Sequence, residues 1–324
     1  MRPRFLAHAL FAALAAALAG TATGDSARPD WQEPLLERLQ AIAANQSGEL
    51  GVYVKDLHSN LAVTLRADER WYMASGIKVP VAIAVLRGVE RGDWQLDTRL
   101  PLAADDFVDG AGSTNQYGPG ERLSVSFLLE QMIIYSDNTA TDRLIRLVGL
   151  DAVNGLVREL VPEGFESITT LGDVRRHIYA ELHPAAAKLG GRDLLRLRQA
   201  REEDARLNRL ASLLGVPRSA LAPISLGGAY AAYYNSNLNA ATLSAYGELL
   251  ERLATGQALG NEQTAYLLGL MSRVKTGSQR LIAGLPKDAR LAHKTGTQRA
   301  RICDSGLIET PQRSEERRVG KECR

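Results

Sequence analysis

The sequence is poor in the residues that build disulfide frameworks and zinc sites. It contains only two cysteines, Cys303 and Cys323, and five histidines among its 324 residues. Two cysteines supply neither a disulfide framework nor a cysteine cluster for a metal. His177 and His183 lie six residues apart and no H-E-x-x-H pattern occurs, which disfavours a zinc enzyme. We therefore predict a protein that uses no metal and no other cofactor.

The sequence also lacks a large excess of charge and, beyond its start, any long apolar run. The formal net charge is +2, and 45% of the residues are hydrophobic. The near-neutral balance argues against a dedicated nucleic-acid binder. The length allows one large domain or two small ones with a substantial core. No later segment is long and apolar enough to cross a membrane, so we expect no stable membrane anchor. We also expect a monomer.

The two ends of the chain differ from the rest. Residues 1–24 combine a short basic start, an Ala/Leu-rich run and small residues, which is the layout of a secretory signal peptide. The apolar run is short for a membrane span. These features predict secretion across the inner membrane into the periplasm. Residues 311–324 are polar and aperiodic, and we interpret them as a foreign-looking tail at a truncated or chimeric gene end.

Residues 25–310 have the periodicities of an α/β protein of the α+β type. Helical spacing at 34–45 is followed by alternation at 48–56 and 61–65, which predicts a helix and a hairpin. Two further strands are expected at 290–297 and 301–308. Helices are expected between them. We therefore predict an antiparallel sheet, with strands from both ends of the chain, packed against helices.

The segment Ala74-Ser75-Gly76-Ile77-Lys78 opens an apolar run that is typical of a buried helix. A Ser and a Lys three residues apart lie on one face of a helix. Ser75 is expected in the first turn, where free backbone N–H groups favour a developing anion. Lys78 is expected beside apolar neighbours, where desolvation helps it lose a proton and activate the hydroxyl. By itself the pattern is common and also fits an ordinary core helix.

Ser136-Asp137-Asn138 lies between two apolar helical segments and is predicted to be a turn. Ser136 can relay a proton to a leaving nitrogen. The amide of Asn138 can bind a substrate or Lys78. An ordinary helix N-cap explains the same residues equally well, because Ser, Asp and Asn are all favoured there.

Lys294-Thr295-Gly296-Thr297 lies in a late alternating segment. A Lys and a hydroxyl on a strand can bind a carboxylate, and Gly allows a substrate to approach the backbone closely. The N–H groups of Thr297 and Ser75 can form an oxyanion hole. A second tripeptide, Lys275-Thr276-Gly277, directly follows a predicted helix, so we interpret it as a helix C-terminal turn.

The three motifs occur in the order S-x-x-K, S-D-N and K-T-G, a set shared by class A β-lactamases and penicillin-binding proteins. From about residue 34 to residue 308 the chain resembles a class A β-lactamase, a member of the penicillin-recognising serine hydrolases. The resemblance implies a five-stranded antiparallel sheet and an all-helical lobe, with the substrate cleft between them.

The resemblance also implies roles for the motif residues. Ser75 is then the acylated nucleophile and Lys78 its activating partner, while Ser136 protonates the lactam nitrogen. Asn138 orients the substrate. The substrate carboxylate and acyl oxygen are held by the K-T-G segment, namely Lys294, Thr295, Gly296 and Thr297.

The sequence departs from the family in three places. The family's deacylating Glu lies in a pattern like E-x-x-L-N, which is absent, and Tyr179-Ala-Glu-Leu-His183 is the nearest match. In one register Glu181 is the base; in the other, Tyr179 occupies the base position and His183 replaces the Asn. We predict that Tyr179 and Leu182 partly bury Glu181, although simple exposure is an equal alternative. Residues 184–239 form an apparent helical insertion. The family's last sheet strand and C-terminal helix are expected to be absent or replaced by the polar tail.

Three functions fit this sequence. The first is hydrolysis of β-lactam antibiotics through an acyl-enzyme on Ser75. The second is a penicillin-binding D,D-peptidase or related serine hydrolase acting on peptidoglycan-derived peptides or esters. The third is a non-catalytic β-lactam sensor, which the absence of a transmembrane segment makes the weakest of the three.

Overall fold

The computed structural model describes residues 31–310 and 313–323, so the predicted signal peptide at 1–24 lies outside the described residues. The chain divides into two compact units. One unit contains the described residues up to Gly76, Leu160–Phe165 and the residues from Ala241 onward. The other contains Ile77–Glu159 and Glu166–Ala240. Each unit is thus assembled from segments that are far apart in the sequence.

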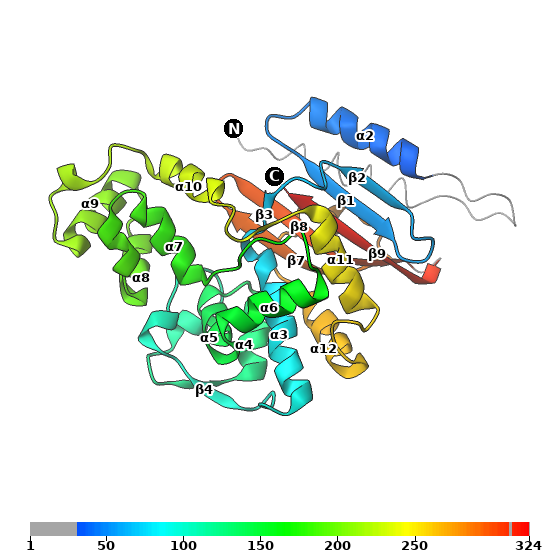
Figure 1. The fold of residues 1–324 in the computed structure, drawn as a ribbon, viewed down its shortest axis with the longest axis horizontal. Coiled ribbons are helices and arrows are strands. Elements are labelled where there is room, and N and C mark those ends of the chain that lie inside the picture. The colour runs from blue at the N-terminus through cyan, green and yellow to red at the C-terminus, as the bar shows by residue number, and fades with distance from the viewer. Residues whose placement is uncertain (1–30, 311–312, 324) are drawn as a thin grey trace, which may run out of the picture. The chain divides into compact units, whose positions relative to one another are not determined.

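The first unit is built on a five-stranded antiparallel sheet in the order β2-β1-β9-β8-β7 (Figure 1). Its strands are β1 (Gly51–Asp56), β2 (Ala62–Leu65), β7 (Arg290–Gln298), β8 (Arg301–Thr310) and β9 (Arg313–Cys323). The predicted hairpins at both ends of the chain are present. The prediction of an antiparallel sheet with strands from both ends is therefore confirmed.

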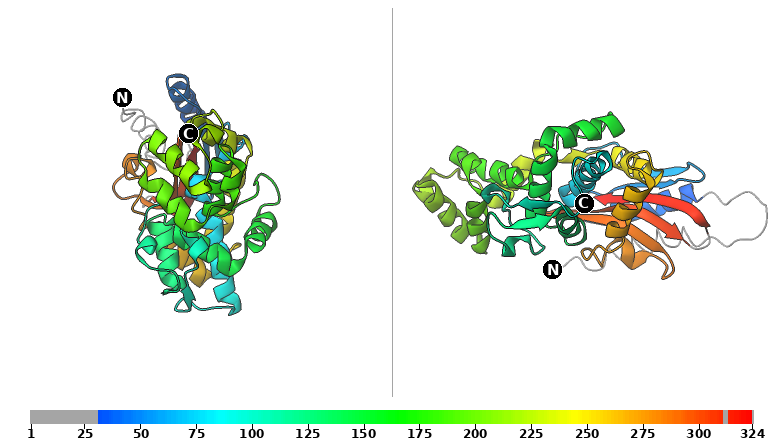
Figure 2. Two further views of the ribbon diagram at one scale, coloured as in Figure 1. Left: turned by 90° about the vertical axis from the view of Figure 1, so that its left-hand side faces the viewer. Right: turned by 90° about the horizontal axis from the view of Figure 1, so that it is seen from below.

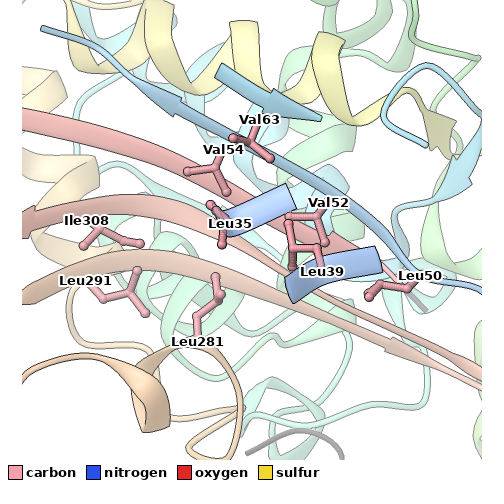
Figure 3. Close-up of a cluster of buried hydrophobic side chains, with 9 residues drawn as sticks. All are labelled: Leu35, Leu39, Leu50, Val52, Val54, Val63, Leu281, Leu291 and Ile308. Atoms are coloured by element: carbon pink, nitrogen blue, oxygen red, sulfur yellow. The ribbon is translucent and has the colours of Figure 1, made fainter. Parts of the chain in front are cut away.

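Helices cover this sheet because its strands alternate apolar side chains between two faces. Val52 and Val54 of β1 pack with Leu35 and Leu39 of α2 (Gln32–Ala44), and Ile308 joins the same cluster (Figure 3). The intervening Tyr53 belongs to a separate cluster with residues of the other face, Trp71, Leu243 and Cys303 among them. The remaining helices of this unit are α11 (Leu243–Ala254), α12 (Asn261–Met271) and the short α13 (Leu281–Gly284).

Strand β9 lies in the polar tail at the end of the chain. The family's last strand was expected to be absent or replaced by this tail, and residues 313–323 form a strand that pairs with both β1 and β8. Its position is in the middle of the sheet, between strands from the two ends of the sequence (Figure 2). Strand pairing uses backbone groups, so a polar stretch with little apolar periodicity can still join a sheet. The foreign origin of residues 311–324 stays a prediction.

The second unit is mainly helical, as predicted. Its helices are α3 (Lys78–Arg91), α4 (Val125–Ile134), α5 (Asn138–Val148), α6 (Leu150–Leu160, whose last residue falls in the first unit), α7 (Leu171–Ala180), α8 (Gly191–Gln199), α9 (Glu203–Leu214) and α10 (Leu226–Asn235). The stretch 184–239 is helical as expected and contains α8 to α10. A small ribbon of β4 (Arg99–Pro101) and β5 (Arg122–Ser124) was missed, because three-residue strands are too short to show alternation.

The described elements also include two very short strands. They are β3 (Trp71–Tyr72) and β6 (Ala240–Ala241). Among the described residues, no helix is both long enough and apolar enough to cross a membrane.

Candidate active site

Ser75 lies in a short 3₁₀ turn, η1 (Ala74–Ile77), which leads directly into α3 at Lys78. The sequence predicted one continuous helix, whereas the first turn is tighter and the α-helix begins three residues later. The preceding Ala74 has a φ of 48°, an uncommon left-handed conformation for a residue with a side chain. The turn is held by hydrogen bonds from the Gly76 N–H to Met73 O and from Tyr246 Oη to Gly76 O, both 2.8 Å. Ser75 is only partly buried.

Lys78 brings the second motif together within the helical unit. Its side chain is 0% exposed. Its Nζ donates to the Asn138 Oδ1 at 2.7 Å, to the backbone oxygen of Ser136 at 2.7 Å and to the Ser136 Oγ at 3.3 Å. These acceptors come from the turn between α4 and α5, about sixty positions along the chain. Of the two partners considered for the Asn138 amide, the structure shows Lys78, and it adds a contact of Lys78 with Ser136 that was not predicted.

The middle residue of this motif, Asp137, acts as the helix cap. Its carboxylate accepts the N–H of Ala140 in the first turn of α5 and the N–H of Thr114. Ser136 has a φ of 63°, which turns the chain sharply just before the cap. The segment is thus both a helix N-cap and part of the candidate site: Asp137 caps the helix, while Ser136 and Asn138 accept hydrogen bonds from Lys78.

Lys294, on β7 in the sheet unit, is also fully buried. Burial lowers its pKa to about 7, although the Asp304 carboxylate works in the opposite direction. Its Nζ donates to the backbone oxygen of Thr295 at 2.9 Å. Asp304 lies on β8 and is hydrogen-bonded to His293 at 2.7 Å. The protonated and neutral forms of Lys294 are therefore both present near neutral pH.

The close packing around Gly296 explains why this position must be glycine. A Cβ atom there would lie 2.5 Å from both Cys303 Sγ and Met73 O. Real Cβ atoms do not approach other heavy atoms so closely. Strand β7 is thus packed against its own sheet unit with no room for a side chain at this point.

Arg280 is a site residue that the sequence reasoning missed. Its guanidinium donates to the backbone oxygens of Gly296 (2.9 Å) and Cys303 (2.7 Å) and to Thr297 Oγ1 (2.6 Å). It therefore fixes the K-T-G strand and adds a positive charge beside it. A guanidinium suits carboxylate binding. The only indication in the sequence was its position three residues after the second K-T-G tripeptide.

That second tripeptide lies in an irregular segment and not in a strand. It begins four residues after the end of α12 at Met271, so it is not the C-terminal turn of that helix, and Gly277 has a left-handed φ of 75°. Nevertheless Thr276 Oγ1 and Thr295 Oγ1 share a hydrogen bond. A Cβ on Gly277 would lie 2.5 Å from Thr295 Cγ2. Lys275-Thr276-Gly277 thus contacts and supports the predicted carboxylate-binding strand.

Glu181 does not have the environment predicted for a general base. Helix α7 ends at Ala180, and Glu181 follows at its C-cap with an exposed side chain. The expectation that Tyr179 and Leu182 would partly bury it is wrong, because both of these neighbours point into the protein while Glu181 lies on the outer side of the helix end. Burial raises the pKa of Tyr179 to about 12, so the phenol is also an unsuitable base. The catalytic role of Glu181 stays a prediction.

The candidate site is made of hydroxyl, amine and cationic side chains. Within residues 31–310 and 313–323, no group of three or more His, Cys, Asp or Glu side chains is placed to hold an ion. One unit supplies the Ser75 hydroxyl and a cationic strand, and the other supplies a buried amine hydrogen-bonded to a second hydroxyl. Hydroxyl and amine groups are the kinds of group used in nucleophilic attack and proton relay.

The fold and these groups define a serine hydrolase of the class A β-lactamase type. The chain belongs to the beta-lactamase enzyme family, whose model matches residues 34–315. It is 26% identical over 262 residues to beta-lactamase CTX-M-97 of Escherichia coli, a match that covers 81% of this chain and 71% of that protein. A beta-lactamase of Streptomyces lavendulae is 35% identical over 159 residues, or 47% of this chain and 52% of that protein.

Solved structures are similar over most of the chain. An ancestral class A beta-lactamase is 25% identical, with a TM-score of 0.64 and coverage of 89% of both chains. The structure of PBP-A has a TM-score of 0.66 at 21% identity, covering 89% of this chain and 85% of that one. At that identity the likeness shows the fold alone.

Proposed function

We propose that the protein is a serine β-lactamase that hydrolyses β-lactams through an acyl-enzyme on Ser75. The observation that carries the proposal is the buried Lys78 Nζ, hydrogen-bonded to Ser136 and Asn138 next to a Ser-x-x-Lys turn. An amine in this position can accept the Ser75 proton when it is neutral. The family membership supports the same chemistry.

In the proposed acylation, Ser75 Oγ attacks the lactam carbonyl and its proton passes to Lys78. The carbon–nitrogen bond of the ring then breaks, Ser136 delivers its proton to the leaving nitrogen, and Lys78 passes the proton it took up to Ser136, 3.3 Å away. Lys294, Thr295, Thr297 and Arg280 bind the substrate carboxylate. The N–H groups of Ser75 and Thr297 stabilise the oxyanion. Hydrolysis of the ester by water restores Ser75.

Incubation with a fluorescent penicillin tests the acylation step. We expect a denaturation-stable adduct, mapped to Ser75 by mass spectrometry, that is absent from Ser75→Ala. A folded protein without an adduct, or equal labelling of Ser75→Ala, would contradict the proposal. Circular dichroism of both proteins provides the folding control.

A peptidase is the second candidate, and the exposure of Glu181 favours it. Without a base for the deacylating water, a penicillin-derived ester persists, and the protein then behaves as a penicillin-binding enzyme. Turnover of nitrocefin against release of D-Ala from D-Ala-D-Ala peptides separates the two. A stable adduct with neither activity would indicate the sensor.

The cellular location is a separate proposal. The Ala/Leu-rich start supports secretion to the periplasm, where β-lactams and peptidoglycan peptides are both present. Expression in a Gram-negative host should yield a periplasmic protein that has lost residues 1–24 or a segment close to them. An unprocessed cytoplasmic product would contradict this proposal. We also propose a monomer, which light scattering can test.

A further inference from the structure

Arg175 on α7 belongs to none of the three motifs, yet it forms a defined ion pair with Asp109. Its Nε lies 2.7 Å from Asp109 Oδ1, and its Nη2 lies 3.3 Å from Oδ2. The two side chains are only 12% and 13% exposed. Burial is the largest influence on the Asp109 carboxyl and raises its pKa, but Arg175, together with Arg198 and Arg206, lowers it overall. A two-point Arg–carboxylate contact of this kind fixes geometry as well as charge.

The backbone of the same Asp109 contacts the active-site amide. The Asn138 Nδ2 donates to the Asp109 carbonyl at 2.6 Å, while Asn138 Oδ1 accepts from Lys78 Nζ at 2.7 Å. A carbonyl oxygen can only accept, and a lysine ammonium can only donate. The two partners therefore determine which way round the amide lies. If the Asp109 carbonyl moved away, the amide would lose one of the two contacts that set its orientation.

The segment around Asp109 packs closely against the second motif. A Cβ on Gly110 would lie 2.8 Å from Asn138 Nδ2. Helix α7 is anchored to α5, since Asp142 accepts the N–H groups of Leu171 and Gly172 at 2.7 Å each. Arg175 thus extends from an anchored helix to the loop that contacts Asn138.

We infer that Arg175 is a positioning residue for acylation. It holds Asp109 so that the Asp109 carbonyl orients Asn138, and Asn138 in turn places the Lys78 amine. The inference rests on the proposed function, in which Lys78 accepts the Ser75 proton. In this scheme the effect of Arg175 on the reaction passes through Asp109 and Asn138.

The first test compares Arg175→Met with Arg176→Met, a matched variant one residue along the same helix. Arg176 pairs with Asp173 and with the Leu189 carbonyl. The second-order rate constant for acylation by benzylpenicillin is measured by mass spectrometry and normalised to the folded fraction. Because small displacements of catalytic groups cost up to about 100-fold, we expect Arg175→Met to acylate about 10-fold more slowly. Arg176→Met should stay within about twofold of the parent.

The second test is a double-mutant cycle with Asn138→Ala. If Arg175 acts through Asn138, Arg175→Met should slow acylation in the parent but not in the Asn138→Ala background. An equal slowing in both backgrounds would mean a general structural role and would overturn the inference. So would an unchanged rate in Arg175→Met. Arg175→Lys keeps the charge but loses the two-point contact, and it replaces Arg175→Met in the cycle if that variant does not fold.

Acylation of the parent protein separates a failure of the proposed function from a failure of the inference about Arg175. A folded parent that penicillin does not acylate contradicts the proposed function itself. A parent that is acylated, with no selective effect of Arg175, contradicts only the inference about Arg175.

Discussion

The two buried lysines of the candidate site belong to different units and are held by different kinds of neighbours. Lys78, in the helical unit, donates to a backbone carbonyl, a hydroxyl and an amide, all of them uncharged. Lys294, in the sheet unit, lies in the field of a carboxylate, Asp304, and its pKa is about 7. Neutral partners fix the position of an amine, whereas a nearby charge also controls its protonation. In the proposed mechanism this difference suits Lys78 for proton relay and Lys294 for binding an anion.

The largest effects on acylation are expected when each lysine is replaced by methionine. Lys78→Met removes the proposed proton acceptor and should slow acylation by roughly 10²- to 10⁴-fold. Lys294→Met should act mainly by weakening the binding of the substrate carboxylate. We expect its effect to be smaller, about 10- to 100-fold, and to lie mostly in KM. Pre-steady-state labelling with a chromogenic cephalosporin measures both, and a larger loss for Lys294→Met would reverse the assignment.

The pH dependence of kcat/KM should reveal the protonation of Lys294. Lys294 binds an anion only when it is protonated, so kcat/KM should fall as the pH rises through about 7. The decline should approach about tenfold per pH unit. The Asp304 carboxylate raises the pKa of Lys294, so Asp304→Asn should move this limb to lower pH. A limb that does not move would show that another group causes it.

Two glycines allow the same comparison at the level of packing. A Cβ on Gly110 would lie 2.8 Å from Asn138 Nδ2, and one on Gly277 would lie 2.5 Å from Thr295 Cγ2. Gly110→Ala should slow acylation by about 10-fold through the displaced amide. Gly277→Ala should instead raise KM, and its left-handed φ adds a stability cost of about 1 kcal/mol. Gly92→Ala is a control, since its φ is also left-handed but a Cβ there meets nothing within 4 Å.

A buried acid in the helical unit offers a contrast to the buried base in the sheet unit. Burial raises the pKa of Asp142 to about 7, although the N–H groups of Leu171 and Gly172 lower it. In the unfolded chain an Asp has a pKa of about 3.9. The folded state therefore binds the proton more tightly, so this group makes the free energy of unfolding decrease as the pH rises from about 4 to about 7.

Asp142→Asn should remove that contribution. The amide oxygen can replace only one of the two carboxylate acceptors well, which should cost about 1 to 2 kcal/mol of stability at low pH. Urea titrations of both proteins between pH 4 and 7 measure the difference. An identical pH slope in Asp142→Asn would contradict the assignment.

The smallest effect is expected at Glu181. Because its side chain is exposed, Glu181→Gln should slow deacylation by less than the roughly 10²- to 10⁴-fold typical of a lost general base. The lifetime of the Ser75 adduct, followed by mass spectrometry, measures this directly. A persistent adduct in Glu181→Gln alone would restore Glu181 as the base.

Several features of the fold were predictable from local patterns. The helical spacing at residues 34–45 corresponds to α2, and the alternation at 48–56 and 61–65 corresponds to β1 and β2. These patterns are readable because side-chain burial repeats every 3.6 residues in a helix and every two in a strand. Strand β9 could not be read in this way, because its partners in the sheet and not its own side chains decide that it is a strand.

The site shows the same division. The chemical groups of the site are readable from the order of the residues: a Ser and a Lys three residues apart, an Asp that suits a helix cap, and Lys-Thr-Gly tripeptides with the conformational freedom of glycine. Such properties depend on residue type and on near neighbours.

Three relations become visible only in the folded chain: Arg280 holds the Lys294 strand, Arg175 pairs with Asp109, and Glu181 faces solvent. These relations join residues that lie far apart in the chain or depend on which side of a helix end is covered. Contacts of this kind form because the whole chain collapses around its cores, and no local periodicity encodes which distant partner a side chain will meet.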